Sequence, residues 1–208
     1  MERPRLLVWS VTETAGFDAA WVRLGSDRLT ADGEATGQLP GPYSLRYHLE
    51  TGDEWATRRL EVEATTDAGA RTLDLRRTQT GWTVNGETRP DLADALDCDL
   101  AACPLTNTMP IRRFDLHRAS GDRTFLMAFV EVPTLEVVAS RQRYTTVRPL
   151  APRSAGTAGT AGTADTSAIV TYRSDGFESD LEIDADGLVV VYPGLGRRIA
   201  PVSAARGG

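Results

Sequence analysis

Hydrophobic and polar residues alternate along much of the chain. Apolar side chains occupy every second position in four segments, residues 43–49, 60–64, 73–75 and 181–183. A period of two places such side chains on one face of a β-strand, so we predict a half-buried strand in each segment. Residues 126–132 are more evenly apolar, which is typical of a strand covered on both faces.

Turn sequences support the same picture. Asn85-Gly86 follows the strand-like run Trp82–Val84, and Asn-Gly supplies the two positive φ angles of a type I′ hairpin turn. Asp184-Ala-Asp-Gly187 lies between two further strand-like runs and predicts a second hairpin. Turn signals recur about every ten residues, which favours an antiparallel all-β domain over alternating strands and helices.

Only two short segments have helical signals. Residues 90–96 could form one or two turns, with Pro90 at an early position. Residues 106–114 could form a second helix, with Thr106 as the N-cap and Pro110 in the first turn, where its missing N–H costs little.

The segment 148–167 differs in composition from the rest of the chain. It contains Ala-Gly-Thr three times in succession and no large apolar side chain in that repeat. Such a stretch cannot offset its ordering entropy, so we predict a disordered loop that joins two strands. The residues after it suggest little more than a hairpin, which would be marginal alone. We therefore predict a single domain over residues 1–208.

Charge and hydropathy exclude several classes of function. The net charge of −6 disfavours a non-specific nucleic-acid binder, which needs a basic surface. All 23 basic residues are arginine, a bias typical of GC-rich bacterial genomes. Apolar runs fall far short of the roughly 20 residues that a membrane-spanning helix needs. The N-terminus lacks the apolar core of a signal peptide, and we expect a cytoplasmic protein.

Candidate metal and cofactor motifs are weak. Cys98 and Cys103 are four residues apart, but His48 and His117 are remote, and structural zinc sites usually contain closely spaced ligand pairs. Without lysine there is no P-loop, and no nucleophile-elbow motif occurs. We therefore expect buried thiols, no metal and no cofactor.

Arginines next to aromatic residues are more informative. Trp55 precedes a pair of arginines, Arg112 and Arg113 lie in the second predicted helix, and Arg143 precedes Tyr144. A planar guanidinium beside an aromatic ring is a common way to hold a sugar or an anionic head group. The alternative is a solvated strand face whose charges pair across strands.

Several motifs resemble one known family. Residues 106–113 read T-N-T-M-P-I-R-R, close to a T-N-T-L-P-I-R-R signature, and W-A-T-R at 55–58 and G-W-T-V-N-G at 81–86 match further motifs. In this order, over about residues 21–198, they resemble the putative glycolipid-binding family of bacterial proteins. Leu195 stands where we expect a tryptophan.

The resemblance implies a fold and a mode of action. The fold is a spiral β-roll, a long and mostly antiparallel sheet wrapped around a single α-helix, and the protein is expected to be a homodimer. The implied function is non-catalytic binding of a glycolipid or similar amphiphile between the curved sheet and the helix.

We predict a ligand site made of Asn107, Arg112, Arg113, Arg143, Trp55 and Tyr144. A structural role for the polar members of this set is the alternative. Two other functions stay open, a structural or partner-binding dimer without ligand, and an enzyme acting on a small molecule. The enzyme would need titratable groups with shifted pKa values in one pocket, and the candidates are Asp97, Asp99 and His117.

Overall fold

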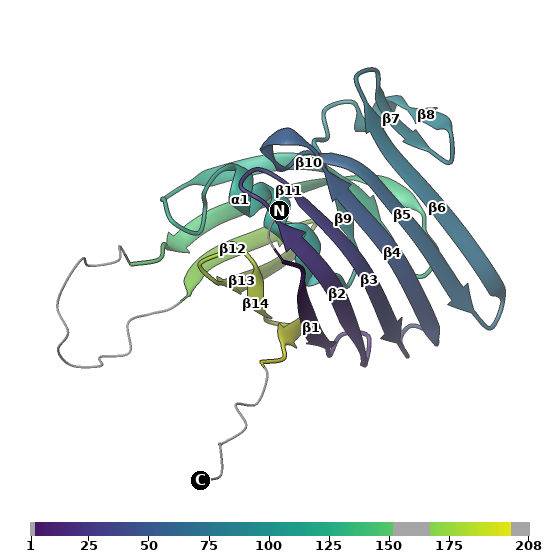
Figure 1. The fold of residues 1–208 in the computed structure, drawn as a ribbon, viewed down its shortest axis with the longest axis horizontal. Helices are drawn as coiled ribbons and strands as arrows, with labels where there is room; N and C mark the ends of the chain where they lie inside the picture. Colours follow the sequence, from purple (N-terminus) through teal and green to yellow (C-terminus); the bar gives the residue numbers. More distant parts are fainter. Residues whose placement is uncertain (1–2, 152–166, 201–208) are drawn as a thin grey trace, which may run out of the picture.

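One large β-sheet dominates the computed structural model, which describes residues 3–151 and 167–200. The sheet has 15 strands, in the spatial order β8-β7-β6-β5-β4-β3-β2-β1-β15-β14-β13-β12-β11-β10-β9. It curls so that β1–β6 form one wall and β10–β14 another, with the helix α1 between them (Figure 1). This confirms the predicted fold class, a long sheet wrapped around one helix.

The first eight strands follow one another as neighbours across the sheet. Their bounds are β1 Arg5–Val11, β2 Gly16–Leu24, β3 Leu29–Gly37, β4 Tyr43–Thr51, β5 Thr57–Thr66, β6 Gly69–Thr78, β7 Gly81–Val84 and β8 Glu87–Arg89. Short 3-10 helices follow β4 and β8, namely η1 Asp53–Trp55 and η2 Pro90–Leu92.

The remaining strands build the other side of the roll. Their bounds are β9 Asp97–Leu100, β10 Asp122–Val130, β11 Val137–Arg148, β12 Ala168–Ser174, β13 Phe177–Ile183, β14 Val189–Tyr192 and β15 Gly196–Arg198. Between β9 and β10 lie the 3-10 helix η3, Pro104–Asn107, and α1, Thr108–Arg113. Neighbouring strands are antiparallel except β9 and β10, which are parallel.

The predicted alternating strands and both hairpins are confirmed, whereas of the evenly apolar segment 126–132 only residues 126–130 belong to a strand, β10. Each alternating segment falls within β4, β5, β6 or β13, and its apolar positions are buried. Asn85 and Gly86 have φ angles of 51° and 88°, as a type I′ turn requires, and they join β7 to β8. The first predicted helix is the single turn η2.

The start of the second helix differs from the prediction. Thr106 lies inside η3 rather than at the N-cap of α1, which is Asn107, and Asn107 makes no side-chain capping bond. The hydroxyl of Thr106 instead lies 2.7 Å from a carboxylate oxygen of Asp99 on β9. A tertiary contact therefore replaces the local cap that the sequence suggested.

The predicted loop at 148–167 falls mostly on residues outside the described ranges. Its first residue, Arg148, ends β11, and β12 begins directly after its last residue. These two strands pair with each other, with Tyr144 opposite Tyr172.

The space between helix and sheet is filled by side chains. Leu105, Met109 and Ile111 are each 0% exposed, and they pack against the inward-facing residues of the surrounding strands. Burial of this apolar surface is the main stabilising contribution to the roll.

Candidate functional site

A buried polar network connects η3 to the sheet. The carboxylate of Asp99 on β9 lies 2.7 Å from the hydroxyl of Thr106 and 2.6 Å from Nε2 of Gln142 on β11. The hydroxyl of Tyr144 lies 2.9 Å from Oδ1 of Asn107 and 3.2 Å from Oε1 of Gln142. All five side chains are buried, so these hydrogen bonds fix the position of η3 against β9 and β11.

Asp99 lies in an environment that favours a proton. Burial raises the pKa of its carboxyl group, and hydrogen bonds from Thr106 and Gln142 act in the opposite direction. The single hydroxyl proton of Thr106 also faces the carbonyl oxygen of Cys103, 2.9 Å away. A protonated Asp99 could donate to Thr106 and leave the Thr106 proton for this carbonyl, so the contact geometry agrees with the raised pKa.

A cleft of about 190 Å³ adjoins this network. It lies at the end of the roll where the β1–β2 turn, the ends of β12 and β13 and the β14–β15 turn contribute lining residues. Asp99 and Asn107 belong to its polar lining, with Glu13 on the β1–β2 turn. The other lining residues are Leu100, Ala101, Ala102, Cys103, Phe129, Tyr172, Ser174, Phe177, Tyr192 and Leu195.

Three aromatic rings form one wall of the cleft. The ring of Tyr172 lies 5.9 Å from that of Tyr192 and 6.1 Å from that of Phe177, and the last two are 6.2 Å apart. Tyr172 also packs edge-on against Tyr144 of the polar network, with ring centroids 5.3 Å apart. Phe177 is 44% exposed, so an apolar ring surface is open to a ligand at this end of the roll.

The other end of the helix has a different arrangement. Arg113 makes two bonds of 2.6 Å to the carboxylate of Asp97 and one of 2.7 Å to the backbone oxygen of Glu54. The guanidinium of Arg112 lies 4.5 Å above the ring of Trp55 and donates to the backbone oxygen of Asp186. Arg113 and Asp97 are a buried ion pair, whose geometry ties the end of α1 to β9 and η1.

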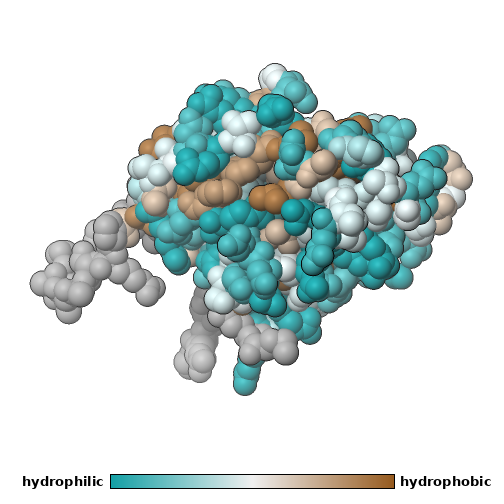
Figure 2. Space-filling view, turned by 90° about the horizontal axis from the view of Figure 1, so that it is seen from above, coloured by the Kyte–Doolittle hydropathy of each residue, from teal (hydrophilic) through white to brown (hydrophobic). Residues whose placement is uncertain are grey.

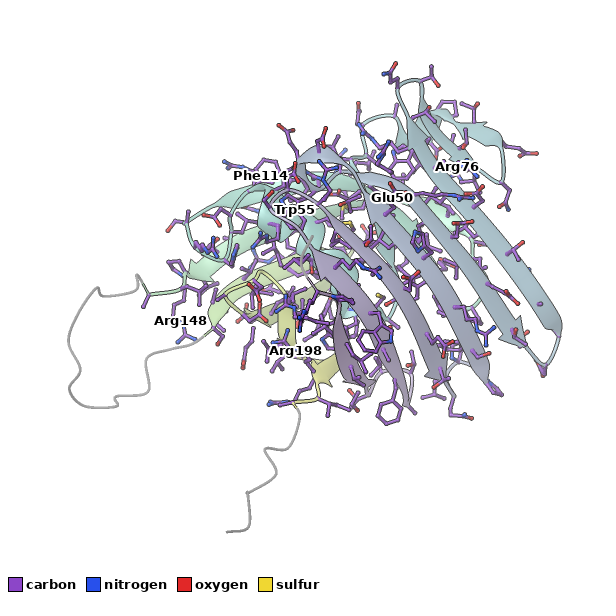
Figure 3. The ribbon with its side chains drawn as sticks, viewed as in Figure 1. Glu50, Trp55, Arg76, Phe114, Arg148 and Arg198 are labelled. Atoms are coloured by element: carbon purple, nitrogen blue, oxygen red, sulfur yellow. The ribbon has the colours of Figure 1, made fainter. Side chains whose placement is uncertain are left out.

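Figures 2 and 3 show this end of the roll from two directions. The labelled Trp55 and Phe114 lie near each other beside the helix in Figure 3. From above, hydrophobic residues gather in a band across the molecule, bordered on both sides by hydrophilic residues (Figure 2). Phe114 is 36% exposed and stacks on Phe125 with 5.2 Å between ring centroids.

The predicted site residues therefore do not meet in one place. Asn107 and Tyr144 meet in the polar network, and Asn107 lines the cleft. Arg112 and Trp55 contact each other, but Arg113 is engaged in its own ion pair. Arg143 faces the outer side of the sheet, with its Nε 2.8 Å from a carboxylate oxygen of Asp122. No hydrogen bond among the described residues links Arg143 to the helix.

The sequence interpretation missed most of the cleft. Gln142 occupies an inward position of β11, in alternation with Tyr144, and a polar residue on the buried face of a strand was the available signal. Asp99, which the sequence suggested as a titratable candidate, has Thr106 and Gln142 as its direct partners. Tyr172, Tyr192 and Phe177 were not predicted as site residues, because nothing local indicates that their strands meet.

Other residues with potential chemistry lie apart from the cleft or are packed in the core. Cys98 and Cys103 are buried free thiols, and burial raises the pKa of Cys98 to about 12. His117 is 1% exposed, and burial lowers its pKa. Within residues 3–151 and 167–200, no three His, Cys, Asp or Glu side chains come close enough together to hold a metal ion.

The fold and the cleft can now be compared with known proteins. The sequence profile of the family described as "Putative glycolipid-binding" matches residues 6–198, nearly the whole chain. The chain belongs to this family. The resemblance to the glycolipid-binding family, inferred from the T-N-T-M-P-I-R-R segment, is thus confirmed. No curated protein matches the chain.

A solved structure has the same fold. It is the crystal structure of a DUF1089 family protein from Pseudomonas aeruginosa, 29% identical to this chain, with a TM-score of 0.68. The match covers 88% of this chain and 92% of the other. The family name supports a binding role in general. In the described part of this glycolipid-binding family member, no helix combines the length and apolarity needed to cross a membrane.

Proposed function

We propose that the protein binds an amphiphile without catalysing a reaction, and that the cleft at the end of the roll holds the polar head group. The observation that carries this proposal is the combination of an aromatic wall, in which Phe177 is exposed, with buried, hydrogen-bonding side chains at one small opening. Aromatic rings stack on the apolar face of a sugar, and convergent polar groups orient its hydroxyls. The family name points to the same class of ligand.

The size of the cleft limits what it holds. Pockets for drug-sized ligands measure roughly 300–1,000 Å³, whereas this cleft measures about 190 Å³. It accommodates a single sugar ring rather than a whole lipid. We therefore put the head group in the cleft, with the acyl chain leaving across Phe177, and not between helix and sheet as the sequence led us to expect. Side chains such as Leu105 and Met109 already fill that space.

The first experiment measures binding of octyl β-D-glucoside, below its micelle concentration, by isothermal titration calorimetry. We expect saturable binding at one site per chain. Phe177→Ala should weaken it about tenfold, because a stacked ring is lost from the cleft. Phe177 is half exposed, so this variant should still fold, and circular dichroism checks that it does.

The matched control is Phe17→Ala. Phe17 is 54% exposed on β2 and is not part of the cleft lining, so its loss should leave the affinity unchanged. No binding by the wild type, or equal weakening by both variants, would argue against the cleft. Mass spectrometry of an organic extract of the native protein would then show whether any amphiphile copurifies.

A second candidate, a partner-binding homodimer, is favoured by a different surface. Trp21 on β2 and Leu6 on β1 are directly paired, 52% and 50% exposed, on the outer face of the sheet. Exposed apolar pairs of this kind commonly mark protein interfaces. Light scattering coupled to size-exclusion chromatography should give a dimer mass for the wild type and a monomer mass for Trp21→Glu. A monomeric wild type would count against this candidate.

A further inference from the structure

The charges that line the cleft have one sign. Glu13 supplies a carboxylate, Asp99 supplies a second carboxyl group whose pKa is raised by burial so that it carries less negative charge, and no arginine or histidine is among the lining residues. This is unusual for a chain with 23 arginines. A cleft that recognised a phosphate, a sulfate or a uronic acid would present guanidinium donors to it, because Arg matches such groups with two parallel hydrogen bonds.

Glu13 is the exposed member of the pair. Its backbone N–H donates to the carbonyl oxygen of Leu195 at 3.2 Å, which holds the β1–β2 turn beside the β14–β15 turn. In the described part of the chain its carboxylate makes no ion pair. An unpaired carboxylate at the mouth of a small opening repels anions and attracts cations, and the effect is largest at low salt.

Nearby arginines belong to the other face of the sheet. Tyr172 points into the cleft, and the next residue, Arg173, points outward and forms an ion pair with Glu178. In the same way Tyr144 faces inward, and Arg143 faces outward and pairs with Asp122. The two-residue period of the strands thus keeps these guanidinium groups out of the cleft lining; they line instead a neighbouring cavity of about 450 Å³, which shares Ser174 and Phe177 with the cleft.

We infer that the cleft accepts a head group without negative charge, a neutral sugar or one with a protonated amine, and that Glu13 is a specificity-determining residue for this choice. The inference rests on the proposed function and narrows its ligand class. Selectivity of this kind comes from repulsion of the wrong ligand as much as from attraction of the right one.

The experiment compares three octyl glycosides that differ in charge. These are the neutral octyl glucoside, the octyl glucosaminide with a protonated amine, and the octyl glucuronide with a carboxylate. At 20 mM salt we expect the glucuronide to bind about tenfold more weakly than the glucoside, and the glucosaminide to bind at least as tightly as the glucoside. At 500 mM salt the differences should shrink.

Glu13→Gln separates the charge effect from folding and shape. It should bring the affinity for the glucuronide to within about threefold of the affinity for the glucoside, and it should leave the affinity for the glucoside unchanged. The control Glu87→Gln removes an exposed carboxylate from β8, outside the cleft, and should preserve the wild-type ranking.

The possible outcomes distinguish the two proposals. If the glucoside binds and the glucuronide binds equally well or better, the charge inference is overturned and the proposed function stands. If none of the three glycosides binds, the proposed function fails, and the inference fails with it. If Glu13→Gln keeps the full discrimination, Glu13 is not the residue that sets it.

Discussion

The hydroxyl of Tyr144 lies 2.9 Å from Oδ1 of Asn107, inside the protein, and so connects the centre of β11 to the last residue of η3. Both side chains are almost fully buried. Asn107, which lines the cleft, is therefore held in position by β11, whose other face is exposed to solvent. This contact links the stability of the roll to the shape of the cleft.

Removal of this hydroxyl should be measurable. Tyr144→Phe keeps the ring packing but removes the single hydroxyl proton that faces both Oδ1 of Asn107 and Oε1 of Gln142, and we expect a loss of about 1–3 kcal/mol in the free energy of unfolding. Urea denaturation followed by tryptophan fluorescence measures it. Tyr172→Phe is the control. Among the described residues its hydroxyl has one hydrogen-bond partner, the partly exposed Ser174 hydroxyl, so its removal should cost less. Equal losses in both variants would contradict a special role for the network.

Asp18 should make the stability depend on pH. It is 0% exposed, its Oδ2 has no partner among the described residues, and burial raises its pKa to about 6. The folded protein thus holds this proton more tightly than the unfolded chain does, whose pKa is about 3.8. Its contribution to stability is complete below about pH 4 and is lost as the pH rises through about 6, a change of order 3 kcal/mol.

The variant Asp18→Asn tests this expectation. Its Oδ1 can still accept the hydrogen bond from Tyr47, but it has no titrating proton. The free energy of unfolding, measured at pH 4.5 and pH 8, should fall less with rising pH in the variant than in the wild type. Asp67→Asn, at an exposed turn, should behave like the wild type. If Asp18→Asn and the wild type lose the same stability over this range, Asp18 titrates normally.

The Arg113–Asp97 ion pair should be structural. Arg113→Met leaves a buried carboxylate without its partner, and we expect a loss of about 3–5 kcal/mol in the free energy of unfolding. The double variant Arg113→Met/Asp97→Leu should recover much of this loss, because it removes both charges together. Arg143→Ala, which breaks an exposed pair on the outer face, should cost under about 1 kcal/mol.

Binding measurements on the same variants test the ligand site that was predicted from the sequence, which included Arg113 and Arg143. Provided that they fold, Arg143→Ala and the double variant should bind octyl glucoside like the wild type. A tenfold loss in Arg143→Ala would return this arginine to the list of ligand-binding residues.

Leu195 offers a gain-of-affinity test. It lines the cleft from the β14–β15 turn, at the position where the family resemblance leads us to expect tryptophan. Leu195→Trp adds a further aromatic ring to the cleft lining, and we expect about three- to tenfold tighter binding of octyl glucoside in calorimetry. Leu39→Trp, at an exposed turn outside the cleft lining, is the control. Weaker binding by Leu195→Trp would mean that the added ring blocks the opening.

Local patterns were sufficient for the strands and insufficient for the site. The alternation around Tyr47 and the Asn85-Gly86 turn depend on neighbouring residues, and both appear in the structure as predicted. Thr106 looked like a helix cap because capping is the common local role of threonine. Its true partner, Asp99, is seven residues away across the β9–η3 connection, and tertiary contact outweighs local preference there.

The cleft lay further beyond reach of sequence reasoning. Its lining needs Tyr172 from β12, Phe177 from β13 and Tyr192 from β14 at one end of the roll, together with a turn that carries Glu13. Which strands lie together is decided by the order across the sheet, and no local signal reports that order. The arginines that attracted attention in the sequence turned out to be engaged in ion pairs, in a stacking contact with Trp55 or on the outer face.

The pairing of β1 with β15 has a consequence for how the protein folds. Trp9 faces Arg198 across this seam, although nearly the whole described chain separates them in sequence. On one side of the seam, β1–β8 pair in sequential hairpins, which form early because their loops are short. The seam itself must wait until β15 has been synthesised, and closing so long a loop is entropically costly. Until then the edge of β1 that will pair with β15 has free backbone N–H and C=O groups. A nascent chain would be most prone to wrong strand pairing and to aggregation at this edge.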